Sequence, residues 1–182
     1  MTVSSDHPDQ ATTAHLIRWE VVEATESERK EHMTNEEFVR HAYDLAEVND
    51  IQGWIDCFTP DGVFVDNSVE VTYTGPAEVA KPVEYYGAAF SDMHRELKDI
   101  YVSDDVVVVQ LALQGTHDGA LHLPFGMLPP TGKRMDAPCC DVFKLADGKL
   151  QRFDCYPEGS VILSQLGVLG NLDAVLQPHV TV

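Results

Sequence analysis

The sequence predicts an α+β fold in which helices pack on one face of a curved, mostly antiparallel sheet. Amphipathic helical segments come first, over about residues 34–58 and 75–90, and strand-like segments follow from residue 94. Such an order is typical of α+β proteins. The length of 182 residues fits one domain. We expect a cone with an apolar base and an open mouth, a shape that suits small-molecule binding.

The first helix begins at Thr34, because Thr34-Asn35-Glu36-Glu37 fits the capping box. It is expected to end at Asn49-Asp50. Its apolar side chains share one helical face: Phe38, Ala42, Leu45 and Ala46. A second, short helix follows, because four apolar residues have the spacing of a buried stripe: Ile51, Trp54, Ile55 and Phe58.

The segment 59–62 has the composition of a turn, and Val63–Asp66 reads as a short strand. Gly75-Pro76 can open a third helix that runs to about Phe90, with Pro82 kinking it or delaying its start. Four strands are then predicted, over residues 94–102, 106–116, 134–145 and 150–156. The last two are joined by an Asp147-Gly148 hairpin turn, and a final helix covers residues 159–169.

The predicted domain spans residues 34–172. A polar extension, residues 1–33, precedes it and contains a helical piece over 16–28, and residues 173–182 form a tail.

With 12 Lys and Arg against 30 Asp and Glu, the net charge is −18, which argues against nucleic-acid and anionic-membrane partners. Neither a secretory signal nor a membrane-spanning apolar run is visible. None of the four cysteines forms a C-x-x-C pair, so we expect free thiols and a cytoplasmic location.

Two polar residues continue apolar strand faces. His117 follows Val107, Val109, Leu111 and Leu113 in phase, and Asp141 stands among Met135, Ala137, Cys139 and Phe143. A carboxyl and an imidazole in one dry cavity can move a proton near neutral pH. The alternative is structural: Asp141 could pair with Arg152, and His117 could be a core histidine with its hydrogen bonds satisfied.

The last strand groups Leu150, Arg152, Asp154 and Tyr156 on one face. Glu158 then begins the final helix, where a carboxylate suits the helix dipole. His94 lies on a mixed face, which favours a structural role.

Metal binding is not predicted, because His117 and His122 match no zinc pattern and Cys139-Cys140 are adjacent. Dinucleotide, P-loop and nucleophile-elbow motifs are also absent.

The order of several short motifs resembles the SnoaL-like proteins of the nuclear transport factor 2-like superfamily, which holds polyketide cyclases, ketosteroid isomerases and limonene epoxide hydrolases. The resemblance covers residues 37–170, about three quarters of the chain. The matching stretches are residues 49–66, Phe90–His94, Gly115–Gly119, Pro129–Lys133, Asp141–Phe143, Asp147–Leu150 and Gln165–Gly167.

The resemblance implies a cone-shaped fold, a homodimer through the sheet and a cofactor-free aspartate acid/base in an aldol closure. The family's H-W-D-x-x-D motif falls on residues 153–158 here. Glu158 takes the place of the second aspartate, Cys155 of the first, and Asp154 of the tryptophan. The base is therefore expected to be Asp154 or Glu158.

The leading hypothesis is a cofactor-independent cyclase or isomerase acting on an apolar, carbonyl-bearing small molecule, polyketide-like or terpenoid-like. His117 would polarise the enolate oxygen, Asp141 would orient His117 or Arg152, and the 121–130 loop would act as a lid. Candidate substrate-binding residues are His94, Trp54, Phe58, Tyr43, Phe64, Tyr86, Phe90, Phe125 and Tyr156. The alternatives are a hydrolase or dehydratase, with Asp141 and Asp154 sharing a water, and a non-catalytic binding protein.

Overall fold

The computed structural model describes residues 33–170. Its main feature is a curved six-stranded sheet in the order β2-β1-β8-β7-β4-β3, in which β1 runs parallel to β8 and the other pairs are antiparallel. These strands are β1 (Phe58–Asp66), β2 (Val71–Thr74), β3 (His94–Ser103), β4 (Val106–Thr116), β7 (Arg134–Ala146) and β8 (Lys149–Pro157). The predicted helical piece over 16–28 and the predicted tail lie outside the described residues.

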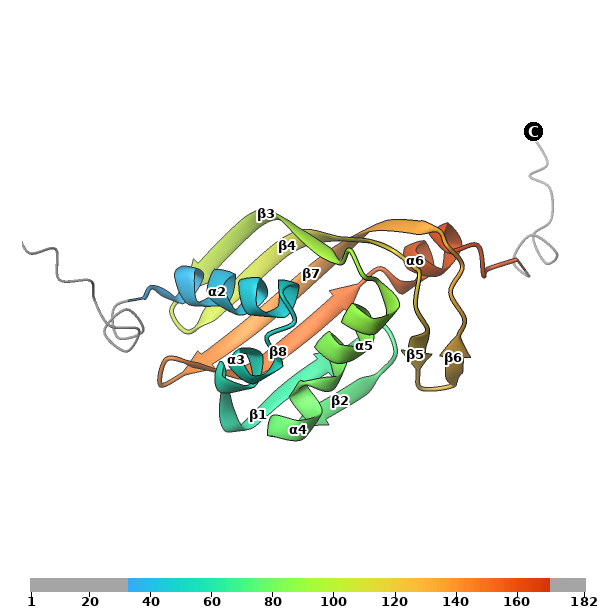
Figure 1. Ribbon diagram of the computed structural model, residues 1–182. Coiled ribbons are helices and arrows are strands. Elements are labelled where there is room, and N and C mark those ends of the chain that lie inside the picture. The colour runs from blue at the N-terminus through green and yellow to red at the C-terminus, as the bar shows by residue number, and fades with distance from the viewer. Residues whose placement is uncertain (1–32, 171–182) are drawn as a thin grey trace, which may run out of the picture.

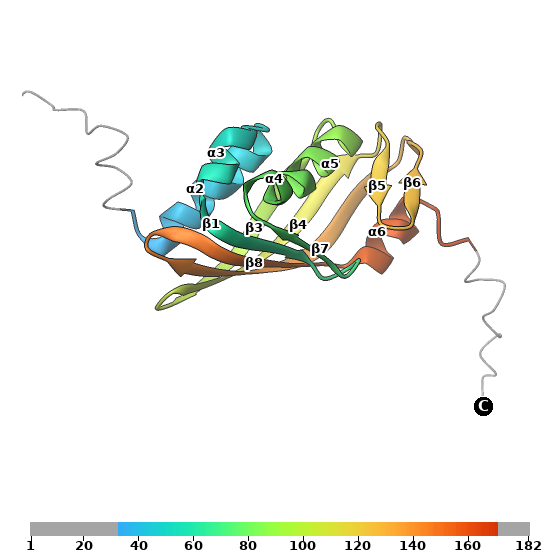
Figure 2. The ribbon, with the colours of Figure 1, turned by 90° about the horizontal axis from the view of Figure 1, so that it is seen from below.

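Helices cover one face of the sheet, as Figures 1 and 2 show. They are α2 (Asn35–Glu47), α3 (Ile51–Asp56), α4 (Pro76–Val79) and α5 (Lys81–Ala89). A separate hairpin of β5 (Leu121–Leu123) and β6 (Gly126–Leu128) stands beside α5, and α6 (Gly159–Gln165) follows β8 at that same end of the molecule. The predicted α+β class is confirmed.

The capping box at Thr34 is confirmed. The Thr34 side chain accepts a hydrogen bond from the Glu37 amide at 3.2 Å, and the Thr34 amide donates to the Glu37 carboxylate at 2.8 Å. Between α4 and α5 the helix is interrupted just before Pro82, as its missing N–H requires. The turn between β7 and β8 has positive φ at Asp147 and Gly148, as a tight hairpin needs.

Other boundaries differ from the prediction. Residues 59–62 belong to β1 rather than to a turn, with an irregularity in the pairing to β8 between Phe58 and Val63. The short edge strand β2 was missed, and the predicted 121–130 loop contains the β5–β6 hairpin. The final helix ends at Gln165, before the predicted residue 169.

A bulge in β8 reverses the predicted phase of that strand. Leu145 pairs with Leu150, but Lys144 pairs with Arg152, so Gln151 is an extra residue. Leu150, Phe153 and Cys155 therefore face the helices, whereas Asp154 faces the opposite side of the sheet. The predicted grouping of Leu150 with Asp154 is wrong, because side-chain alternation holds only where the register is continuous.

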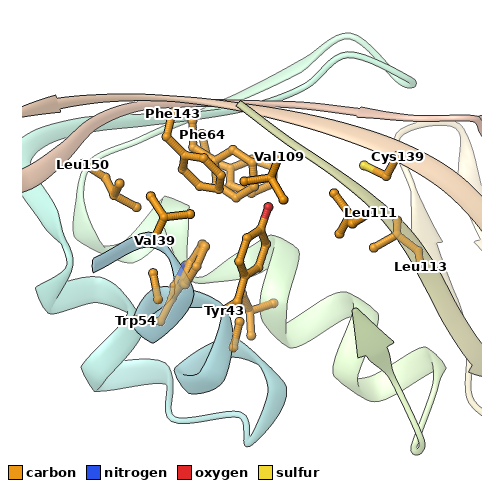
Figure 3. Close-up of a cluster of buried hydrophobic side chains, with 14 of the residues drawn as sticks. Val39, Tyr43, Trp54, Phe64, Val109, Leu111, Leu113, Cys139, Phe143 and Leu150 are labelled. Carbon is orange, nitrogen blue, oxygen red and sulfur yellow. The ribbon is translucent and has the colours of Figure 1, made fainter. Parts of the chain in front are cut away.

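The core lies between the sheet and the helices, and Figure 3 shows part of it. Trp54 is buried and donates its indole N–H to the Val79 carbonyl at 2.8 Å. Phe153 packs against Phe64 and Phe143, with ring centroids 4.5 and 4.2 Å apart. No helix among residues 33–170 is long and apolar enough to cross a membrane.

Replacing Thr34 with Ala tests the start of the fold. We expect Thr34→Ala to lower the free energy of unfolding by about 1 kcal/mol, because the cap at the N-terminus of α2 is lost. Thr34→Ser keeps the hydroxyl and should keep most of the stability. Urea unfolding of both variants is the measurement, and equal stability would contradict the capping role.

Candidate functional site

Two adjoining cavities open on the helix-covered side of the sheet. The outer one has a volume of about 620 Å³ and lies between α5, α6 and the β5 end of the hairpin. The inner one, of about 40 Å³, lies deeper, against β3, β7 and β8. Asp66, Pro82 and Tyr86 line both cavities, so the inner cavity forms the base of the outer one.

A row of three polar side chains crosses the sheet at the inner cavity. Asp66 of β1 pairs in register with Cys155 of β8, and Cys155 pairs with Asp141 of β7. Paired residues on neighbouring strands point to the same face, about 4.8 Å apart. Two residues earlier along β8, the corresponding row is the aromatic trio of Phe64, Phe153 and Phe143. The polar row thus borders a wall of aromatic rings.

Asp141 is the buried carboxyl of this row. It is 2 % exposed, and its Oδ2 accepts a hydrogen bond from the Tyr43 hydroxyl at 2.6 Å. The Cys139 thiol donates to its Oδ1 at 3.2 Å. Burial raises the pKa of Asp141, and the hydrogen bonds and the Arg95 charge counteract this only in part. In Figure 3 the Tyr43 hydroxyl points from α2 toward the sheet.

Three other groups that line the inner cavity, Tyr43, Tyr86 and Cys155, have raised pKa values. Burial raises the pKa of Tyr86, and burial together with Asp141 raises that of Tyr43. The Cys155 thiol has a raised pKa because of its contact with Cys139 and its burial. The Tyr86 hydroxyl forms no hydrogen bond with any described residue, although it lines both cavities.

Arg95 was missed from the sequence. It lines the inner cavity with a side chain that is 12 % exposed. The alternation of buried and exposed residues along β3 could have identified it: Arg95 and Leu97 face inward, whereas His94 faces outward. The register shift between Leu97 and Asp99 makes Lys98 an extra residue, which hid this phase. Asp66 was missed too, although it shares the inward phase of Phe64.

The structure does not place Asp154 or Glu158 in either cavity. Asp154 lies on the opposite face of the sheet, in register with Val142, and binds the Arg152 guanidinium through two hydrogen bonds of 2.6 Å. Glu158 is exposed at the start of α6. The expectation that Arg152 pairs with Asp141 is therefore also wrong, because the β8 bulge turns Arg152 outward.

His117 is buried as predicted but stands far from Asp141. Asp141 pairs with Val109, eight residues before His117, which is roughly 26 Å of extended chain. The His117 Nδ1 accepts the Thr131 amide at 3.2 Å, so the neutral ring carries its proton on the buried Nε2, which has no partner among the described residues. Burial lowers the pKa of His117. It holds the segment before β7. Asp141 therefore does not orient His117, and His117 lines neither cavity.

The predicted substrate-binding residues divide into three groups. Tyr43, Trp54, Phe64, Tyr86 and Phe125 line one or both cavities. Phe58 and Phe90 are buried in the core without lining a cavity. His94 and Tyr156 are exposed, His94 beside Glu47 and Tyr156 on the opposite face of the sheet.

One group of side chains could approach a metal ion. The ligand atoms of Cys139, Asp141 and Cys155 lie within 4.8 Å of one another. In the structure these atoms bind each other: Cys139 donates to Asp141, and the two sulfur atoms lie 3.7 Å apart. We assign the group a hydrogen-bonding role that holds the Asp141 carboxyl in place.

The raised pKa of Asp141 predicts a pH-dependent stability difference. Its folded-state pKa lies above the ordinary value of 3.8, so the folded protein binds more protons than the unfolded chain between the two values. Relative to Asp141→Asn, the wild type should lose stability as pH rises through this window. Urea unfolding from about pH 4 to about pH 8 measures it, and parallel stability curves would contradict it.

Comparison with known proteins agrees with this architecture. A model of the SnoaL-like domain matches residues 39–153. A candidate SnoaL-like polyketide cyclase from Jannaschia sp. CCS1 is 23 % identical, covering 72 % of this chain and 90 % of its own, with a TM-score of 0.65. A search of curated proteins gave no match.

Two further solved structures share the fold. A protein with a ketosteroid isomerase-like fold from Catenulispora acidiphila, in complex with trimethylamine, is 19 % identical over 74 % of this chain and 95 % of its own, with a TM-score of 0.63. IdmH, a candidate polyketide cyclase from Streptomyces antibioticus, is 19 % identical over 73 % and 98 %, with a TM-score of 0.61. The matched domain spans more than half of the sequence, and the chain belongs to the SnoaL-like domain family.

Proposed function

We propose that the protein is an acid/base enzyme that moves a proton next to the carbonyl of an apolar small molecule, in a cyclisation or isomerisation. The observation that supports it most is the buried Asp141 carboxyl at the inner cavity, held by Tyr43 and Cys139. We therefore assign to Asp141 the role of base that was predicted for Asp154 or Glu158.

The cavities set the size of the substrate. A volume of about 620 Å³ lies within the range of small-molecule sites. Aromatic and aliphatic side chains such as Tyr73, Tyr85 and Ile162 line it. The inner cavity, at about 40 Å³, has room for one functional group. The apolar body of the substrate would therefore occupy the outer cavity, and its carbonyl end would reach Asp141.

Asp141 would act as the base. A carboxylate removed from water is a stronger base than one on the surface, because desolvation disfavours its charged form. A carboxyl base beside neutral hydrogen-bond donors in an apolar site is an established arrangement for proton abstraction from carbon. Tyr86 would donate its hydroxyl proton to the carbonyl oxygen as negative charge develops there. These steps use only side chains of the chain itself.

The hydrolase alternative required a water shared by Asp141 and Asp154. These side chains point to opposite faces of the sheet, since Asp154 is in register with Val142. The structure therefore gives this pair no support. A non-catalytic binding protein remains the competing proposal, and the dimer through the sheet stays a prediction.

Hydrogen exchange into substrate-like ketones tests the proposal. We expect the wild type to exchange protons next to the carbonyl of cyclic ketones and diketones with deuterium from the solvent, as followed by NMR. Asp141→Asn should lower the exchange rate at least about 100-fold, because the base is lost. Asp154→Asn is the matched control on the opposite face of the sheet and should keep the rate.

Tyr86→Phe tests the proposed donor in the same assay. Loss of one hydrogen bond to the developing oxyanion is expected to slow exchange by about 100-fold, with a smaller change in ketone binding. Ketone binding without exchange in the wild type would favour the binding protein. Equal loss in Asp141→Asn and Asp154→Asn would reject Asp141 as the specific base.

A further inference from the structure

We infer that Arg95 binds an oxyanion of the substrate and that this oxyanion is the enolate of an acidic beta-dicarbonyl group. The reaction in this inference rests on the proposed function, but the binding of the anion does not. The inference assigns a ligand class to the inner cavity: a flat, delocalised oxyanion attached to an apolar body.

The Arg95 guanidinium is buried and incompletely paired. Its Nη1 is inaccessible to solvent and has no hydrogen-bond partner among residues 33–170. The Glu47 Oε2 lies 3.8 Å from Nη1, which makes an ion pair beyond hydrogen-bond range. Glu47 also accepts from the Arg95 amide at 3.3 Å and contacts His94. A buried guanidinium without a full set of acceptors is costly. Since Arg95 also lines the inner cavity, its charge is available there to a ligand oxygen.

Arg95 is the one Lys or Arg among the described residues that line the inner cavity. Two carboxyls face the same space, Asp66 and Asp141, and both would repel an anion when ionised. When Asp141 accepts the substrate proton it becomes neutral, so the enolate forms beside one negative charge fewer. Asp66 lies at the junction with the outer cavity, where Ser68 donates two hydrogen bonds to its Oδ1, at 2.9 Å from the amide and 2.7 Å from the hydroxyl.

The shared inner cavity lets Arg95 and Asp141 act on the same functional group. Both residues line this one narrow cavity, so a single functional group that enters it can meet both of them. In a beta-dicarbonyl compound, the acidic carbon is bonded directly to the carbonyl carbons. A carboxylate does not meet this requirement, because its negative charge makes the adjacent C–H far less acidic.

The proton transfer balances without another reactant. The proton moves from the carbon to an Asp141 oxygen, and the electron pair of the broken C–H bond moves to the carbonyl oxygen. That oxygen becomes the enolate oxygen that Arg95 binds through a charge-assisted hydrogen bond. In an isomerisation, Asp141 then returns the proton to another carbon of the enolate. In a cyclisation, the enolate carbon attacks a second carbonyl carbon of the substrate, the π electron pair of that carbonyl moves to its oxygen, and this oxygen takes the proton from Asp141.

Calorimetric titration with matched ligands tests this inference. The probes are dimedone, a cyclic beta-diketone that ionises in water, its neutral methyl enol ether, and benzoate. The full chain should bind ionised dimedone at least about tenfold more tightly than the ether. Arg95→Met should abolish this preference. Arg95→Lys should keep part of it, because the charge remains while the planar fork is lost. Arg152→Met, on the opposite face of the sheet, should keep all of it.

Three results would overturn the inference. They are equal wild-type affinities for dimedone and its ether, an unchanged preference in Arg95→Met, and benzoate binding as tight as dimedone. Thermal unfolding of each variant verifies that it is folded. If Arg95→Met does not fold, the titrations of the wild type and of Arg95→Lys test whether Arg95 binds the anion. The anion preference without deuterium exchange would refute the proposed function alone. Exchange without the preference would refute only the role of Arg95.

Discussion

The pairing of β8 with both of its neighbours is the constraint on which the candidate site depends. β8 is hydrogen-bonded to β7 on one side and to β1 on the other, and the extra residue Gln151 sets its phase from there to Pro157. With this phase, Cys155 stands between Asp66 and Asp141 on the helix-covered face. Without the bulge, the alternation would carry Asp154 into that position and place Cys155 on the opposite side.

Burial then determines the chemistry of the row. Phe64, Phe153 and Phe143 border the row of Asp66, Cys155 and Asp141 and exclude water from that side. The helix α2 supplies Tyr43 as a hydrogen-bond donor to Asp141. A carboxyl in these surroundings costs stability when ionised, which is the usual condition of a group kept for acid/base work. Arg95 carries a second cost, because its Nη1 is buried without an acceptor. Both residues line the same small cavity, and a substrate that accepts from Arg95 and gives a proton to Asp141 would offset part of these costs.

Much of the fold could be predicted from the sequence because its local signals are strong. The capping box at Thr34, the Asp147-Gly148 turn and the alternation of residues 106–117 all held, and the alternation correctly buried His117 and Asp141. The site could be predicted only in part. Alternation gives the wrong face beyond a bulge, and the bulges in β3 and β8 lie beside Arg95 and Asp154. Which buried groups share a cavity depends on strand order, and the parallel pairing of β1 with β8, which brings in Asp66, left no local sequence signal.

The central claim is that Asp141 is a desolvated acid/base group, and a pH titration of its carboxyl carbon by ¹³C NMR tests it most directly. The signal is assigned by its absence in Asp141→Asn. The account predicts a midpoint above the ordinary value of 3.8, because burial opposes ionisation more than Tyr43, Cys139 and Arg95 favour it. A midpoint at or below 3.8 would show a well-solvated or strongly paired carboxylate and would contradict the account.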